Sequence, residues 1–248
     1  MRARIVAGLS HPERIVPDDT EPGIVALHMK RYAFALSSCR ERDVLDVACG
    51  VGYGTAVLAE VARSVVGGDI DEDAVSYART RYNRPNVQFT VLDAESLPFE
   101  DATFDTICSF ETIEHLARPE ALVREAARAL RPSGTFIVST PRVAQTTHRP
   151  ENPHHRVEFA RHDFEMLLST YFNDVTVYGQ RRRETHRHQI LRRIDVLGLR
   201  RRSSLLRRAS VLTGSPSTEH ATLDDILISL DEVDRATELV AVCSHPRR

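Results

Sequence analysis

The sequence predicts an α/β fold built on a doubly wound, mostly parallel sheet, and three observations support this prediction. Short apolar segments alternate along the chain with segments of helical pattern, and strands joined in this way pair in parallel through right-handed crossovers. One apolar run, residues 44–47, passes into a turn that holds Gly50, Gly52 and Gly54, and a helical pattern follows over 55–63. The length of 248 residues suits one domain with a sizeable core.

Apolar runs of strand length define the sheet. The first run contains one acid, Asp46, and otherwise has the continuous apolar character of a buried strand. The predicted strands span residues 44–47, 64–69, 87–91, 106–110, 135–139, 174–178, 226–230 and 238–243. The last two are closing strands, and an antiparallel hairpin is one arrangement for them.

Helical segments separate most of these strands. Apolar residues at helical spacing before the first strand predict an amphipathic helix in front of the core. Asp71 has the side chain and the position of a helix N-cap, and Pro132 with Gly134 ends a later helix. The predicted helices span residues 28–39, 55–63, 72–82, 120–130 and 163–171.

The composition is that of an ordinary soluble globular protein. The net charge is −2 and 42% of the residues are hydrophobic, which separates the chain from polycations, disordered chains and membrane spans. No apolar run reaches membrane length, and no hydrophobic signal-peptide region follows the first arginines. We therefore expect a cytoplasmic protein without a membrane partner. The four cysteines lie far apart without any C-x-x-C pair, so they are expected to be buried thiols.

The glycine turn predicts a ligand site. Glycines allow backbone conformations closed to other residues and a close approach of a ligand, while the next helix offers free N–H groups at its start. The pattern is G-x-G-x-G, whereas dinucleotide folds use G-x-G-x-x-G. Asp69 ends the second strand, 19 positions after Gly50, where a carboxylate can accept hydrogen bonds from both hydroxyls of a ribose. A nucleotide-like cofactor is therefore expected.

A family resemblance rests on four signals that occur in the expected order: the glycine turn, Asp69 at the end of the second strand, Asp93 and Ala94 after the third, and the acidic turn after the fourth. Three stretches carry the resemblance: VLDVACGVGYG at 44–54, SFETIEHL at 109–116 and LRPSGTFIVSTP at 130–141. Over about residues 43–142 the chain resembles the class I S-adenosylmethionine-dependent methyltransferases. Segments 31–35, 158–159 and 171–172 are similar to the small-molecule and glycan branch, of the methyltransferase type 11 kind. The resemblance implies a Rossmann-like sheet of about seven strands, mostly parallel with the last one antiparallel.

The resemblance also implies S-adenosylmethionine as the cofactor and assigns residues to it. Asp69 would bind the ribose hydroxyls, Asp93 and the Ala94 N–H would bind the adenine edge, and Ile70 would lie against the adenine face. Asp46 lies inside a buried strand, and its carboxylate is expected to hold the glycine turn by accepting hydrogen bonds from the N–H groups of the turn. The expected cofactor-binding residues are Asp46, Ala48, Cys49, Gly50, Gly52, Gly54, Asp69, Ile70, Asp93, Ala94 and Phe110.

The expected chemistry is an in-line methyl displacement, which a protein assists mainly by alignment and by excluding water. An amine acceptor needs little more, whereas a hydroxyl acceptor needs a base for its proton, and histidine suits neutral pH. His115 follows the fourth strand at the carboxyl edge of the sheet, so it is the expected base, with Glu114 and Glu111 as further catalytic candidates. The Glu114 carboxylate is expected to increase the basicity of His115. In the alternative interpretation, His115 orients the loop or caps the next helix.

The acceptor is expected to meet Tyr32, His154 and His155. The two histidines belong to a region that also contains His148 and His162. Their spacing fits no zinc pattern, and magnesium prefers carboxylates, so no metal is predicted. Eleven arginines crowd residues 181–208, and they are interpreted as a solvated helix face, with a phosphate-binding patch as the alternative.

Residues 1–248 are expected to form a single domain: an N-terminal lid over 1–42, a cofactor-binding core over 43–180, and an arginine-rich insertion with closing strands over 181–248. The expected function is methyl transfer to an oxygen, ahead of a nitrogen, of a small molecule such as a sugar unit or secondary metabolite. An RNA methyltransferase, an NAD(P)-linked dehydrogenase and a noncatalytic protein of the same fold are the alternatives. A nucleic-acid partner is not expected, and the oligomeric state is left open, including a homodimer.

Overall fold

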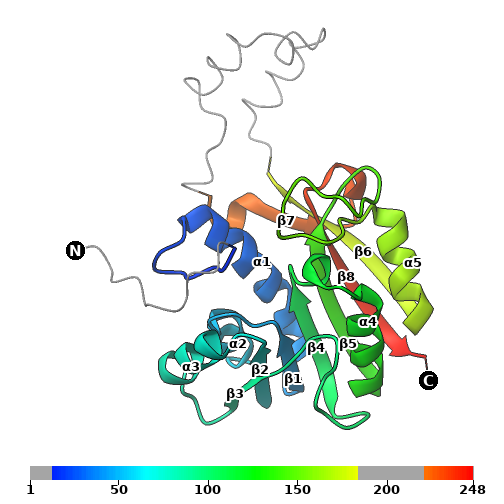
Figure 1. Cartoon of the computed structure of the whole chain (residues 1–248). Helices are drawn as coiled ribbons and strands as arrows, with labels where there is room; N and C mark the ends of the chain where they lie inside the picture. The colour runs from blue at the N-terminus through cyan, green and yellow to red at the C-terminus, as the bar shows by residue number, and fades with distance from the viewer. Residues whose placement is uncertain (1–12, 184–220, 248) are drawn as a thin grey trace, which may run out of the picture.

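The computed structural model describes residues 13–183 and 221–247. In these residues an eight-stranded sheet has the order β3-β2-β1-β4-β5-β8-β6-β7 (Figure 1). Neighbours among β1 to β5 are parallel, and β8 is antiparallel to β5 on one side and to β6 on the other. The predicted fold class is confirmed. The order reverses beside β1, and ligands bind at such a switch point in open α/β sheets.

The elements follow the predicted order. The strands are β1 (Asp43–Val47), β2 (Ser64–Asp69), β3 (Val87–Val91), β4 (Phe104–Phe110), β5 (Leu130–Pro141), β6 (Phe172–Arg182), β7 (Ile226–Ser229) and β8 (Glu238–Pro246). The α-helices are α1 (Pro22–Cys39), α2 (Tyr53–Leu58), α3 (Glu72–Arg81), α4 (Pro119–Ala129) and α5 (Arg161–Tyr171), and short 3-10 turns are η1 (Ile113–His115), η3 (Leu223–Asp225) and η4 (Val233–Arg235).

Helices cover both faces of the sheet because its central strands are apolar on both sides. Val44 of β1 packs in a core with α1 and α2, whereas the next residue, Leu45, packs in the core that holds α4 and α5. Successive side chains of a strand point to opposite faces, so these are two layers on either side of the sheet (Figure 1). The helix α3 packs against β2 and β3, and Asp71 caps it by accepting the N–H groups of Asp73 and Ala74.

The last strands differ from the prediction in their pairing. All eight strands predicted from the apolar runs form, one more than the resemblance implied, but β7 and β8 do not form a hairpin with each other. Instead β7 pairs with the end of β6, and β8 enters between β5 and β6. The burial of the two strands explains this: β8 is buried along most of its length, as an interior strand is, whereas most of β7 is only half-buried and lies at the edge.

Two further predictions concern the rest of the chain. The four cysteines are all free and buried, as expected. Most of the arginine-rich segment, residues 184–208, lies outside the described residues. Within the described part of the chain, no helix combines the length and the apolar character needed to cross a membrane.

Candidate functional site

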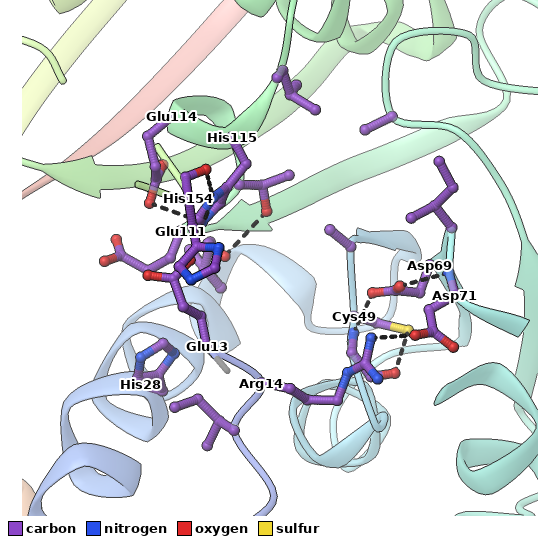
Figure 2. A pocket seen from close by; sticks show the side chains of 18 of the residues that line it. Glu13, Arg14, His28, Cys49, Asp69, Asp71, Glu111, Glu114, His115 and His154 are labelled. Carbon is purple, nitrogen blue, oxygen red and sulfur yellow. Dashed lines mark hydrogen bonds and ion pairs between the residues drawn. The ribbon is translucent and has the colours of Figure 1, made fainter. Parts of the chain in front are cut away.

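A cavity of about 590 Å³ opens at the carboxyl ends of the parallel strands. It is bordered by the residues that follow β1, β2, β3 and β4, together with helix α1 and the segments around residues 14 and 155 (Figure 2). Most of the predicted site residues line it: Tyr32, Ala48, Cys49, Gly50, Asp69, Ile70, Asp93, Ala94, Phe110, Glu111, Glu114, His115, His154 and His155.

Asp46 does not line the cavity, and its partners differ from the prediction. Its carboxyl is buried beneath the glycine turn and accepts a hydrogen bond from Thr55 Oγ1 at 2.6 Å and a longer one from the Tyr32 hydroxyl at 3.4 Å. Burial raises the pKa of Asp46 to about 7, although these hydrogen bonds act in the opposite direction. Asp46 therefore ties α2 and α1 together through two hydroxyl groups, whereas backbone N–H groups of the turn were expected.

The three glycines of the turn have different roles. Gly50 has φ +55° and borders the cavity, and a Cβ atom there would meet nothing within 4 Å. Gly52 has φ +85°, and a Cβ atom there would lie 2.7 Å from Cβ of Ala78. At Gly54 a Cβ atom would lie 1.8 Å from Cζ of Tyr32. Gly52 and Gly54 are outside the cavity lining, so their task is close packing, and Gly50 is the glycine that a cofactor can approach.

Asp69 connects the glycine turn to the start of α3. Its Oδ2 accepts the N–H of Gly50 at 2.8 Å, and its Oδ1 accepts the N–H of Asp71 at 3.0 Å. Each carboxylate oxygen has two lone pairs, so both oxygens retain a site for a hydroxyl group of a ribose. The position of Asp69 at the mouth of the cavity agrees with the predicted role.

The part of the cavity after β2 and β3 has the chemistry that an adenine ring needs. Ile70 borders it with a side chain that is 72% exposed, while Leu92 borders it from a buried position. Asp93 Oδ1 accepts the N–H of Glu95 at 2.8 Å. Its second oxygen can accept an amino group, and Ala94 lies next to it in the lining. These residues fit the adenosine half of S-adenosylmethionine.

Glu13 and Arg14 are among the lining residues that were not predicted. Arg14 Nη2 lies 2.7 Å from Asp71 Oδ2, and burial of Asp71 is outweighed by hydrogen bonds from Ala74 and Arg14, which lower the pKa of Asp71. Glu13 Oε1 accepts the side-chain amide of Asn152 at 2.7 Å. The segment before α1 thus touches both ends of the cavity (Figure 2). No motif or spacing in the sequence relates residue 13 to residue 152.

The other end of the cavity holds His115 and Glu114. Nδ1 of His115 lies 3.0 Å from the carbonyl oxygen of His154, and a ring that donates from Nδ1 has its lone pair on Nε2. Glu114 Oε1 is 3.9 Å from Nε2. Burial raises the pKa of Glu114 well above its ordinary value, and the charge of Glu111 acts in the same direction. Burial therefore disfavours the negative charge on Glu114 that was expected to increase the basicity of His115, and Glu13, 3.7 Å from Nδ1, is the other nearby carboxylate.

Glu111 is held in a rare backbone conformation beside the same end of the cavity. Its φ is +51°, Ser139 Oγ donates to its Oε1 at 2.8 Å, and the buried Arg31 lies 3.4 Å from its Oε2. Burial, with the charge of Arg31, lowers the pKa of His28 to about 3, so this cavity residue is uncharged at neutral pH. Ser139 and Arg31 therefore hold the Glu111 side chain in place. The positive φ of Glu111 stores backbone strain of about 1–3 kcal/mol, and such strain is typical of functional sites.

The predicted substrate-binding residues lie near the same end of the cavity, and different contacts hold them. The Tyr32 ring borders the cavity and packs edge-on against Phe110 at 5.0 Å, and its hydroxyl faces Asp46. His155 Nδ1 lies 2.8 Å from Glu158 Oε1, and its ring is perpendicular to that of His115 with centroids 4.9 Å apart. His155 and His115 are therefore neighbours, although forty positions separate them in the chain.

Taken together, a doubly wound sheet, a glycine turn after β1 and acids after β2 and β3 around one cavity define a class I S-adenosylmethionine-dependent methyltransferase domain. S-adenosylmethionine is the cofactor of this class, and the residues described above fit it. Residues 45–138 match the family model described as "Methyltransferase domain".

Known proteins agree with this class. The chain is 40% identical over 172 residues to a "probable S-adenosylmethionine-dependent methyltransferase" of Mycobacterium tuberculosis, covering 67% of the chain and 62% of that relative. It is 33% identical over 123 residues to the fatty-acid O-methyltransferase of Mycolicibacterium smegmatis, covering 46% and 45%. The structure of an S-adenosylmethionine-dependent methyltransferase from Thermotoga maritima superposes with a TM-score of 0.58 at 16% identity, covering 88% and 91%, which supports the fold. The chain thus matches less than two thirds of the length of these curated relatives.

Proposed function

We propose that the protein transfers the methyl group of S-adenosylmethionine to an oxygen atom of a small molecule. The single observation that carries this proposal is the arrangement of one cavity with two chemically distinct ends. One end has Asp69, Ile70 and Asp93 for the adenosine, and the other has Glu111 and His115 for an acceptor. The cofactor supplies a methyl group on a positively charged sulfur.

The chain's own groups favour a cationic cofactor and an uncharged acceptor. Acidic side chains line the cavity at both ends, among them Asp69, Asp71, Asp93 and Glu111. Opposite charges attract across a site of low dielectric constant, so these acids favour a sulfonium compound. A phosphate-rich acceptor would meet the same carboxylates and be repelled.

An oxygen acceptor is proposed because a hydroxyl needs a group that manages its proton, and His115 is present for this task. During transfer the S–CH3 bond breaks, an O–CH3 bond forms and the acceptor O–H proton leaves. When no metal ion is bound, the lone pair on Nε2 of His115 receives that proton. The His154 carbonyl meanwhile keeps Nδ1 protonated. The fatty-acid O-methyltransferase among the relatives supports oxygen as the acceptor atom.

The alternatives receive less support. An RNA methyltransferase was inferred only from the arginine-rich segment, most of which lies outside the described residues, while the cavity itself is acidic. A dehydrogenase of related fold is disfavoured by the methyltransferase family match. Fold alone does not assign chemistry, so a direct assay is needed.

The test is incubation of the protein with methyl-labelled S-adenosylmethionine and a fractionated cell extract. The proposal expects label in a fraction of low molecular mass, and the Asp69→Ala variant should lose this transfer. Label that appears in RNA would contradict a small-molecule acceptor. If the protein binds S-adenosylmethionine but the label stays on the cofactor in every fraction, the proposed enzyme activity is contradicted.

A further inference from the structure

The acceptor end of the cavity brings together three side chains of metal-ligating type. Glu13, His115 and His155 each offer one ligand atom, and the three atoms all lie within 4.8 Å of one another. One oxygen of Glu13 is 3.7 Å from Nδ1 of His115, and the other is 3.8 Å from Nε2 of His155. The Glu13 carboxylate thus lies between the two imidazole rings, and all three residues are half-buried.

The contacts around the two histidines set the nitrogen that each can offer to an ion. His155 Nδ1 lies 2.8 Å from the carboxylate of Glu158, which places the lone pair of the ring on Nε2, the nitrogen that faces Glu13. A carboxylate behind a histidine in this way is the usual support of a metal-bound imidazole. Nδ1 of His115 is the ring nitrogen near Glu13, at 3.7 Å, and it also lies 3.0 Å from the His154 carbonyl oxygen. An ion that binds Nδ1 therefore replaces that contact, and the proton of the ring moves to Nε2, which lies 3.9 Å from Glu114. A carboxyl group therefore lies next to either nitrogen of His115.

We propose that Glu13, His115 and His155 bind a divalent transition-metal ion, such as Mn²⁺ or Zn²⁺, at the acceptor end of the cavity. Imidazole is a preferred ligand of transition metals such as Zn²⁺, whereas Mg²⁺ and Ca²⁺ prefer sites made only of oxygen ligands. Three protein ligands leave positions open toward the cavity, as catalytic metal sites do. The sequence spacing predicted no metal because Glu13, the third ligand, lies far away in the chain.

Binding requires a small closure of the site. Ligand atoms bonded to zinc at about 2.0–2.1 Å in a tetrahedron are roughly 3.4 Å apart, so the three side chains have to move together by about 1 Å. The side-chain nitrogen of Asn152 now lies 2.7 Å from Glu13 Oε1 and 3.0 Å from His155 Nε2. The ion would bind these same two atoms, so the Asn152 amide has to turn away when the ion enters.

This inference rests on the proposed function and specifies how the hydroxyl loses its proton. With the ion bound, His115 is a ligand, and the acceptor hydroxyl binds an open position on the ion. The positive charge stabilises the deprotonated oxygen, so the O–H proton leaves to solvent water near neutral pH. The oxygen then forms its bond to the methyl carbon as the S–CH3 bond breaks. An acceptor with two adjacent hydroxyl groups, as in sugars and catechols, can fill two open positions.

The test uses the whole protein, freed of metal with a chelator and then titrated with Mn²⁺ or Zn²⁺ by calorimetry. We expect one ion per chain, and a loss of affinity of at least 10-fold in Glu13→Gln and in His155→Ala. His148→Ala is the matched control, because His148 is an exposed histidine of the same loop that does not line the cavity. The dissociation constant for S-adenosylmethionine should stay unchanged in all three variants, which shows that they are folded.

Equal affinity for the ion in the wild type and in both ligand variants would overturn the site. The activity measurement separates this proposal from the proposed function. Methyl transfer that continues at full rate in the chelator would overturn the metal role and leave the methyltransferase function standing. Specific ion binding without methyl transfer to any small molecule would support the site and count against the function.

Discussion

Gly54 lies directly beneath the ring of Tyr32, so close that a Cβ atom at residue 54 would come within 1.8 Å of Tyr32 Cζ. The same tyrosine contacts Phe110 at the end of β4 edge-on and directs its hydroxyl toward Asp46 in β1. Helix α1, the glycine turn and the two central strands are therefore joined at one ring. Because this ring also borders the cavity, the packing of α1 and the shape of the site depend on each other.

Gly54→Ala should destabilise the fold because the new methyl group overlaps the Tyr32 ring, which is itself buried. Overpacking of this kind typically costs about 1–3 kcal/mol, and urea unfolding would measure it. A double-mutant cycle with Tyr32→Ala provides the control: in that background the substitution at residue 54 should cost much less. Strictly additive effects of the two substitutions would show that the contact is not what makes glycine necessary here.

Asp46→Asn should change the pH dependence of stability. Burial raises the pKa of Asp46 to about 7 in the folded protein, whereas an unfolded chain titrates near 3.9. Between these values the folded state holds a proton that the unfolded state has lost, so the free energy of unfolding falls as the pH rises. At about 1.36 kcal/mol per pKa unit the loss is on the order of 4 kcal/mol.

The comparison of the two proteins isolates this effect. Asparagine keeps an oxygen that accepts from Thr55 but does not titrate, so the wild type should lose stability relative to Asp46→Asn between about pH 4 and pH 7. His28 titrates with the opposite sign in part of this range, because its pKa is lowered to about 3, and it contributes equally to both proteins. A difference in unfolding free energy that stays constant with pH would contradict the assignment.

The sequence predicted best those features that depend on position along one strand. Asp69 was identified because it ends a predictable strand, and the carboxyl ends of parallel strands meet at one edge. Asp93, two residues beyond the third strand, was assigned through the family resemblance. The contacts of Glu13 were missed because they join segments that only the folded chain brings together. The same limit explains why the predicted partners of Asp46 were wrong. A buried acid in a strand can be identified from the sequence, but the hydroxyl groups that donate hydrogen bonds to it cannot.

Asp69→Ala should weaken the binding of S-adenosylmethionine by about 1.5–3 kcal/mol, which is roughly 10- to 150-fold in the dissociation constant. The substitution removes the acceptor for the ribose hydroxyls and also releases the N–H of Gly50. Calorimetry with the purified protein measures the change. Asp73→Ala, which removes an exposed acid of the nearby helix α3, serves as the control for charge. Unchanged binding in Asp69→Ala would show that Asp69 only supports the turn.

His115→Ala should lower kcat by about 10²- to 10⁴-fold at saturating cofactor, since either a proton acceptor or a metal ligand is lost. Binding of S-adenosylmethionine should remain normal, because His115 lies at the acceptor end of the cavity. His148→Ala should retain the wild-type rate. Turnover of His115→Ala close to that of the wild type would indicate an acceptor that needs alignment alone, such as an amine.

The most direct test of oxygen methylation is to follow the methyl carbon itself. With S-adenosylmethionine carrying a 13C-labelled methyl group and the active small-molecule fraction, NMR distinguishes a methyl group on oxygen from one on nitrogen or carbon. We predict a single new O–CH3 signal that forms in step with S-adenosylhomocysteine and is absent with Asp69→Ala. An N–CH3 or C–CH3 signal in its place would contradict the account.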